Sequence, residues 1–293
     1  MRRIGTTMVG AAAMLLASTL ASLAQQKIDV VASFSILGDL VRNVGGDRVN
    51  VTTLVGPNGD AHVYTPSPQD AKKVTDAKLV VVNGLGFEGW LPRLVKSSGG
   101  QAVIVTASDG IAERDIGSRA DPHAWQSVVN AKAYVSNIRE ALVAVDPAGA
   151  ATYKANAAAY RAKLDTLDAD VRAAVATIPE ARRQVISSHD AFGYFADAYG
   201  IAFVAPQGVS TDSEPSAQDL AKIIGQIKIA KIPAVFLENI SDPRLMRRIA
   251  AETGAKIGGT LYSDSLTAEN GDAPTYIDMV RHNIKALTSA LNP

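Results

Sequence analysis

The chain has 293 residues, with 29 basic and 29 acidic side chains, no cysteine and a mean hydropathy of +0.08. This charge balance argues against a nucleic-acid partner and against polybasic docking to a membrane. The lack of cysteine excludes a disulfide framework, so the core must stabilise the fold by itself.

The first residues are typical of a secretory signal peptide, which we assign to residues 1–24. Arg2 and Arg3 give a positive start, and the apolar run from Val9 to Leu20 is too short to span a membrane. The stretch "ASLA" then offers a cleavage site of small residues. We expect a bacterial periplasmic protein that is soluble and, without a cysteine at the cleavage site, carries no lipid anchor.

Alternating strand and helix patterns follow, and we assign residues 25–147 to an N-terminal lobe. Its predicted helices cover 36–46 and 67–77, and the second has Ser67 as N-cap and Pro68 in its first turn. The predicted strands are short, apolar and rich in valine, as in parallel sheets. They cover residues 27–34, 49–55, 78–84 and 101–107.

The middle of the chain is predicted to be helical. An amphipathic segment over 127–145 precedes an alanine-rich run, which we assign as a linking helix over residues 148–179. At 1.5 Å per residue this run would extend roughly 40 Å if fully helical.

Residues 180–293 return to the alternating pattern and form the predicted C-terminal lobe. Its predicted strands cover 183–188, 201–206, 233–239 and 255–261. Its predicted helices cover 191–200, 216–230, 242–254 and 274–291.

The two lobes share a weak internal repeat. The stretches "TPSPQDAKKVTDAKLVVVNG" and "EPSAQDLAKIIGQIKIAKIPAVFLEN" both contain a capping serine, Gln-Asp, an amphipathic helix, a lysine and a buried strand. The predicted fold class is therefore α/β, with two similar lobes of mainly parallel sheets joined by one long α-helix.

Three of the four histidines lie close to the carboxyl ends of predicted strands. His62 follows the second strand, His123 follows the fourth, and His189 ends the first strand of the second lobe. Asp264 follows the last strand. Open α/β sheets bind ligands at this edge, so facing lobes would bring the four residues together in the interlobe cleft. Imidazole suits zinc, copper, iron and nickel, whereas carboxylate oxygen leans toward manganese and magnesium.

Other interpretations of these residues stay open at this point. Each loop histidine taken alone is more often a surface or hydrogen-bonded residue, and Asp264 could occupy an ordinary turn. Glu238 and Asp190 are rival ligands, and Asp190 could equally cap a helix or support His189. His282 lies inside a predicted helix and is expected at the surface.

Several stretches resemble, in family order, the solute-binding proteins of zinc/manganese ABC importers, the metal-binding cluster A-I family. They are "VVASFSILGDLVRNVGGDRVNVTTLVGP", "DAHVYTPSPQD", "LVVVNGLGFEGWL", "DPHAW", "SSHDAFGYFADAYG", "SAQDLAKI" and "GTLYSDSL". The resemblance covers nearly the whole mature chain. It implies two (βα)4-type lobes bridged by one long rigid α-helix. It also implies a metal held between the lobes by His62, His123, His189 and Asp264, and delivery to an inner-membrane permease. It also implies a monomer, with a periplasmic metallochaperone as an optional further partner.

The resemblance also bears on the choice of metal. Zinc-type members of the family carry histidine at the position of His189, whereas manganese-type members carry glutamate, so Zn²⁺ is expected as the transported ion. Many zinc-type members have a histidine-rich insertion before the second ligand, and "SDGIAERDIGSRADPHAW" lacks it. Mn²⁺, alone or together with Zn²⁺, is therefore the alternative. The carboxylates of this stretch are expected in a solvated loop: Asp109, Glu113 and Asp115.

Two other functions compete with metal capture. A metallohydrolase would need an open metal position and a general base, but the sequence contains no HExxH, GxSxG or phosphate-loop motif. A binder of organic solutes would need an aromatic or arginine-lined pocket, and we expect Trp90 and Trp125 to serve packing instead. The sequence therefore predicts a binding protein that is not an enzyme.

Overall fold

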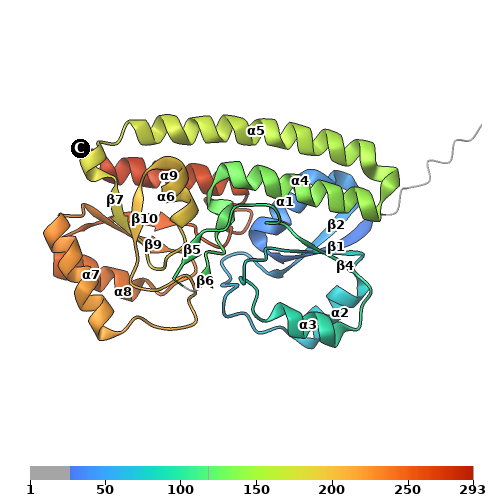
Figure 1. Ribbon diagram of the computed structural model, residues 1–293, viewed down its shortest axis with the longest axis horizontal. Coiled ribbons are helices and arrows are strands. Elements are labelled where there is room, and N and C mark those ends of the chain that lie inside the picture. The colour runs from blue at the N-terminus through green and yellow to red at the C-terminus, as the bar shows by residue number, and fades with distance from the viewer. Residues whose placement is uncertain (1–26, 118, 293) are drawn as a thin grey trace, which may run out of the picture.

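The computed structural model describes residues 27–117 and 119–292, and the predicted signal peptide, residues 1–24, lies outside them. Two four-stranded parallel sheets lie side by side, and the long helix α5 (Ala150–Ala176) runs past both of them (Figure 1). Within the described ranges, no helix combines the length and the hydropathy that a membrane span requires. The predicted α/β fold with two sheets and a joining helix is confirmed.

The first sheet has the strand order β2-β1-β3-β4, and each neighbouring pair is parallel. Its strands are β1 (Ile28–Phe34), β2 (Val49–Val55), β3 (Leu79–Val82) and β4 (Val103–Thr106). All four residues of β3 are buried, as a continuous run of leucine and valine inside a parallel sheet predicts. The predicted helices are present as α1 (Ser35–Gly45) and α2 (Pro68–Asp76).

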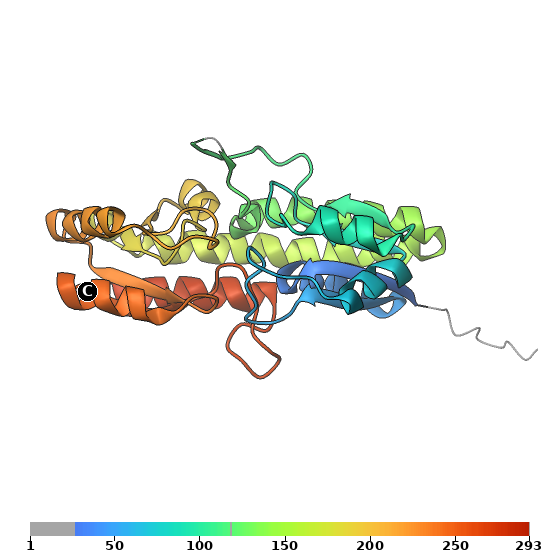
Figure 2. The ribbon, with the colours of Figure 1, turned by 90° about the horizontal axis from the view of Figure 1, so that it is seen from below.

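The sequence patterns do not predict three short elements of this lobe. Helix α3 (Leu91–Ser98) has only eight residues, too few to show a helical period, and packs on α2. Strands β5 (Asp115–Ile116) and β6 (Arg119–Ala120) form a two-residue antiparallel pair. In Figure 2 the β5–β6 segment stands out from one face of the molecule, between the two sheets.

The joining helix is packed along its length. It follows α4 (Val128–Val145) and contacts α1, α4 and α9 (Tyr276–Leu291). Its buried residues recur every three or four positions and so form one face: Tyr153, Ala157, Tyr160, Leu164, Leu167, Val171 and Val175. One continuous apolar stripe therefore packs the helix against elements that follow both sheets.

The second sheet repeats the topology of the first. Its strand order is β10-β9-β7-β8. Counted within each lobe and read from matching edges, both sheets have the order second, first, third, fourth strand. The strands are β7 (Gln184–Ile186), β8 (Ala202–Val204), β9 (Ala234–Glu238) and β10 (Lys256–Leu261). The helices between them are α6 (Gly193–Tyr199), α7 (Ala217–Ala230) and α8 (Pro243–Thr253). The internal repeat in the sequence is therefore a repeat in structure.

The repeated serine caps a helix in both lobes. The Ser67 hydroxyl accepts the Asp70 N–H at the start of α2, and the Ser216 hydroxyl accepts the Asp219 N–H at the start of α7. The Asp70 carboxylate also accepts from Ser67 N–H (2.8 Å), Tyr64 OH (2.8 Å) and Lys73 Nζ (2.9 Å). Burial disfavours this carboxylate, but these hydrogen bonds outweigh it and hold the pKa of Asp70 well below its usual range.

Replacing Asp70 with alanine should lower the free energy of unfolding by about 1–3 kcal/mol at pH 7, because the donors of Ser67 and Tyr64 lose their acceptor. A carboxyl whose pKa is lowered by folding stabilises above its unfolded pKa of about 3.9. That stabilisation is lost as pH falls through the lower folded pKa. Urea denaturation measures the loss.

The matched control for this substitution is Asp76→Ala at the other end of α2. Asp76 pairs with Lys72 at an exposed position, so its loss should change the unfolding free energy by less than about 0.5 kcal/mol. Equal denaturation midpoints for the two variants would contradict the stabilising role of Asp70.

Hydrogen bonds tie the two lobes together close to the ends of their strands. Trp125 Nε1 and Gln126 Nε2 both donate to the carbonyl of Ser263, at 2.9 and 2.6 Å. The Tyr276 hydroxyl donates to the carbonyl of Trp125 at 2.6 Å. Trp125 is therefore buried as part of the contact between lobes, which agrees with the packing role expected from sequence.

Candidate metal centre

His62 lies in the loop between β2 and α2, with its side chain buried. Its backbone N–H donates to Asp60 Oδ1 at 2.9 Å, which fixes the turn that carries it. The other oxygen of Asp60 accepts the hydroxyl of Thr211, from the second lobe, at 2.6 Å. The ring of Phe87 stands edge-on to the His62 imidazole with 4.7 Å between centroids, so one side of the site is apolar.

His123 comes directly before the 3₁₀ turn Ala124–Gln126 and is fully buried. Asp121 Oδ1 accepts both the backbone N–H of His123, at 3.0 Å, and its Nδ1–H, at 2.7 Å. A carboxylate on Nδ1 fixes the tautomer in which Nε2 carries a free lone pair. The ring of Trp125 lies 5.3 Å from that of His123.

His189 lies just beyond β7. Glu238, at the end of the neighbouring strand β9, supports its imidazole as Asp121 supports that of His123. Glu238 Oε2 accepts from His189 Nδ1 at 2.6 Å and from the Ser263 hydroxyl at 2.8 Å. Glu238 Oε1 accepts the backbone N–H groups of Ser188 and His189 at 2.7 and 3.1 Å. His189 therefore also presents Nε2 to the space between the lobes.

Asp264 follows β10 and is fully buried among the three imidazoles. Its Oδ2 lies 3.1 Å from His62 Nε2 and 3.0 Å from His189 Nε2, and its Oδ1 lies 3.6 Å from His123 Nε2. Within the described part of the chain, Oδ1 has no hydrogen-bond donor. A buried anionic oxygen without a donor is costly unless a cation neutralises it.

The four side chains together form a site of the size of a metal ion. Their ligand atoms all lie within 4.8 Å of one another. Four ligands at about 2.1 Å around a tetrahedral zinc ion would be about 3.4 Å apart, close to the shorter separations found here. Three nitrogens and one carboxylate can hold a divalent transition metal, and four protein ligands can close a tetrahedral shell.

Charge interactions within the site oppose the effect of burial. Burial disfavours the imidazolium of His189, but Glu238 and Asp264 outweigh it and raise the pKa of His189 well above its usual value. Burial likewise disfavours charged His123, but Asp264 and Asp121 raise its pKa. Burial also disfavours the Asp264 carboxylate, but His189 and His123 lower its pKa well below the usual range. Without metal, the neighbouring carboxylates therefore favour the protonated forms of His189 and His123.

The structure brings together all four residues predicted from sequence and separates the rival candidates from them. Glu238 accepts from Nδ1 of His189, the ring nitrogen that does not face the cluster. Asp190 does not cap α6, whose N-cap residue is Phe192, and its own N–H donates to the carbonyl of Gly208. His282, expected at the surface, is partly exposed, and its Nε2 lies 3.1 Å from the carbonyl of Thr260.

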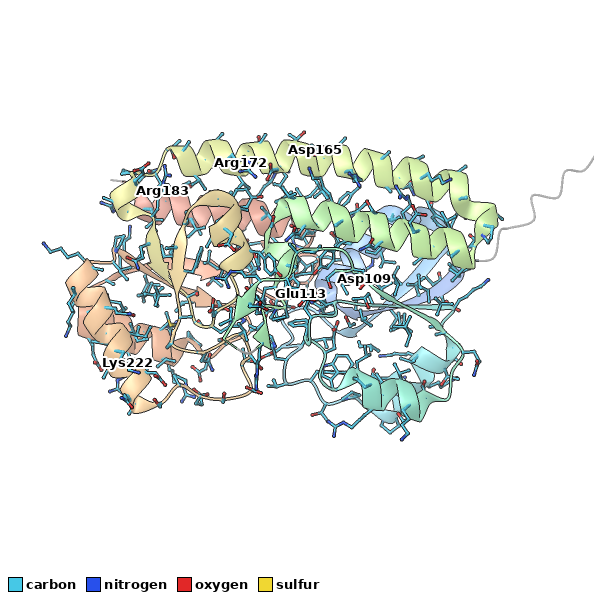
Figure 3. All side chains as sticks on the ribbon, in the orientation of Figure 1. Asp109, Glu113, Asp165, Arg172, Arg183 and Lys222 are labelled. Atoms are coloured by element: carbon cyan, nitrogen blue, oxygen red, sulfur yellow. The ribbon has the colours of Figure 1, made fainter. Side chains whose placement is uncertain are left out.

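Asp121 is the functional residue that sequence reasoning missed. The only sign of this role in the sequence is that Asp121 lies two positions before His123, outside any helix or strand. The neighbouring carboxylates Asp109, Glu113 and Asp115 are exposed, as predicted, and Figure 3 shows the first two between the lobes. Asp242 caps α8 through the N–H of Arg244, at 2.9 Å.

Comparison with known proteins points to one family. The model of the family described as zinc-uptake complex component A, periplasmic, matches residues 30–290. The chain is 37% identical over 266 residues to the manganese-binding lipoprotein MntA of Halalkalibacterium halodurans, covering 90% of this chain and 89% of that protein. It is 36% identical over 266 residues to the iron-binding protein YfeA of Yersinia pestis, covering 89% and 86%.

A solved structure matches equally well. The periplasmic zinc-binding protein TroA from Treponema pallidum has a TM-score of 0.88 and 32% sequence identity, covering 91% of this chain and 100% of that one. These three relatives are thus named for manganese, iron and zinc.

Proposed function

The chain belongs to the periplasmic zinc-uptake component A family of zinc/manganese ABC importers, and we propose that it binds both Zn²⁺ and Mn²⁺. It captures a divalent metal for an ABC importer outside the cytoplasm, and it is a solute-binding protein rather than an enzyme. In this proposal the ligands are His62, His123, His189 and Asp264. Residues 25–147 and 180–293 form the two lobes that enclose the ion, and residues 148–179 link them.

The observation that carries this proposal is the buried cluster of four ligand atoms around the donor-free Asp264 Oδ1. A catalytic zinc keeps one position open for water, whereas four protein ligands leave a tetrahedral ion none. Such a closed shell suits capture and delivery. The ion is the cargo, and it leaves again when the permease accepts it.

The dual specificity rests on two considerations. A third nitrogen ligand, His189, favours zinc, and for any one set of ligands zinc binds more tightly than manganese. However, the relatives at 37% and 36% identity are named for manganese and iron. We therefore propose that the metal loaded in the cell follows its supply rather than an absolute selectivity of the site. In this proposal the chain acts as a monomer and delivers its metal to one permease. A metallochaperone is an optional supplier of the metal.

Calorimetric titration of the full chain, first stripped with a chelator, tests the proposal. We expect one Zn²⁺ and, separately, one Mn²⁺ per chain, with zinc tighter by roughly tenfold or more and able to displace manganese. Failure of manganese to bind would restore a zinc-only assignment. Failure of both metals to bind would discard the four-ligand site.

A further inference from the structure

The two carboxylates that support the histidines are held in different ways. Glu238 accepts hydrogen bonds from Ser188, His189 and Ser263, all in the second lobe. Asp121 binds His123 through Oδ1, and its Oδ2 lies 3.2 Å from Nη1 of Arg114. The support of His123 therefore depends on an arginine, whereas the support of His189 is complete within its own lobe.

Arg114 is itself anchored to the second lobe. Its Nε donates to Asp197 Oδ2 on α6 at 3.1 Å, and its backbone N–H donates to the hydroxyl of Tyr194 on α6 at 2.9 Å. The Tyr194 hydroxyl also donates to the carbonyl of Ala112 at 3.3 Å. The segment before β5 thus crosses from the first lobe to α6, as the position of the β5–β6 segment in Figure 2 illustrates.

Gly193, the first residue of α6, allows this close approach. A Cβ at this position would lie 2.3 Å from Arg114 Nη1, 2.4 Å from Arg114 Cζ and 2.6 Å from Asp121 Oδ2. Any larger residue would push the Arg114–Asp121 pair away from α6. Helix α6 of the second lobe therefore packs closely against Arg114 and Asp121. Asp121 in turn orients His123, a proposed ligand from the first lobe.

We propose that Arg114 is a positioning residue that couples the contact between the lobes to the orientation of His123. When α6 moves away from the segment before β5, Arg114 loses its contacts with Asp197 and Tyr194, so its side chain holds Asp121, and through it His123, less firmly. The proposal rests on the proposed metal-binding function and adds how the contact between the lobes reaches one ligand.

The physical reason is the burial of Asp121. Without Arg114, its Oδ2 would lose a charged donor in a fully buried place, so the carboxylate would turn toward other donors. It would then hold the Nδ1–H of His123 less well. Loss of such an outer partner of a metal-binding histidine typically costs 10–100-fold in affinity.

Stopped-flow measurement of zinc dissociation from Arg114→Gln tests the proposal. The signal is tryptophan fluorescence, since the ring of Trp125 lies 5.3 Å from that of His123. We expect the dissociation rate to rise about tenfold while the association rate stays near that of the wild type. The thermal midpoint should fall, because buried Asp121 loses a charged donor. An unchanged dissociation rate would overturn the proposal.

Arg172→Gln is the matched control. Arg172, on α5 in Figure 3, donates to the carbonyl of Ala198 at the end of α6 at 3.0 Å and pairs with Asp168. It holds the same helix with the same kind of side chain, without a link to a metal ligand. Its loss should leave zinc dissociation unchanged, and an equal acceleration would show that α6 is merely loosened, which also overturns the proposal.

Asp197→Asn decides the matter if Arg114→Gln folds poorly. Asp197 is exposed, so the variant keeps the core and weakens the anchor of Arg114 on α6. An exposed ion pair is worth less than a buried one, so we expect dissociation to rise only about threefold. Wild-type rates would count against the coupling. Failure of the wild-type chain to bind zinc at all would instead refute the proposed function, so the two failures are distinct.

Discussion

Replacing His189 with alanine should lower the affinity for zinc by more than about 100-fold, because outer partners alone are worth 10–100-fold and His189 is proposed to bind the ion directly. The substitution removes a buried nitrogen 3.0 Å from Asp264 Oδ2. It also removes the Nδ1–H donor from Glu238, which leaves a buried carboxylate partly unsatisfied. Calorimetric titration of the stripped variant with zinc measures the change.

His282→Ala is the control, because it makes the same chemical change on α9, away from the cluster. His282 packs against Tyr262, with 4.8 Å between ring centroids, and faces the carbonyl of Thr260. Its loss should leave zinc affinity within about twofold of the wild type and lower stability by about 1 kcal/mol. If both variants bound zinc alike, His189 would not be a ligand.

The metal-free protein should be less stable above neutral pH than in mildly acidic solution. Folding raises the pKa values of His189 and His123, so their contribution is complete below the unfolded value of about 6.5. It is lost as pH rises through the folded values. Folding lowers the pKa of Asp264, so its contribution is present above about pH 4 and disappears only as pH falls through the folded value.

Zinc affinity should depend on pH in the opposite sense, rising as pH increases through the raised histidine pKa values, because the metal displaces protons from its ligands. Urea denaturation in the presence of a chelator at pH 5.5 and pH 9 tests the first expectation. Calorimetry in buffers of different ionisation enthalpy counts the protons released. His189→Ala should flatten the pH dependence of stability, and a metal-free protein equally stable at both pH values would refute this account.

Much of the fold could be predicted from the sequence because its signals are local. The strands near 27–34 and 78–84 are runs of apolar residues, and α2 begins with a serine cap and a proline. The alanine-rich run predicts α5 to within a few residues at each end. Short elements such as α3 give too few residues for a period to show, so they emerge only from packing.

The residues of the site also fall into two groups, those that the sequence predicts and those that only the tertiary structure reveals. The sequence by itself determined which residue types stand in the loops that follow the strands: His62, His123, His189 and Asp264. Which side chains would support them was decided by tertiary structure, since Glu238 reaches His189 from a neighbouring strand 49 residues away.

The same holds for contacts between the lobes. Arg114 meets Asp197 across 83 residues of chain, and Gly193 leaves the space for that meeting. Sequence periodicity and caps report what each segment does with its nearest neighbours. The spatial distance between two side chains that are far apart in the sequence depends on how the two sheets and α5 pack. That packing is a property of the whole fold, and no single segment of the sequence determines it.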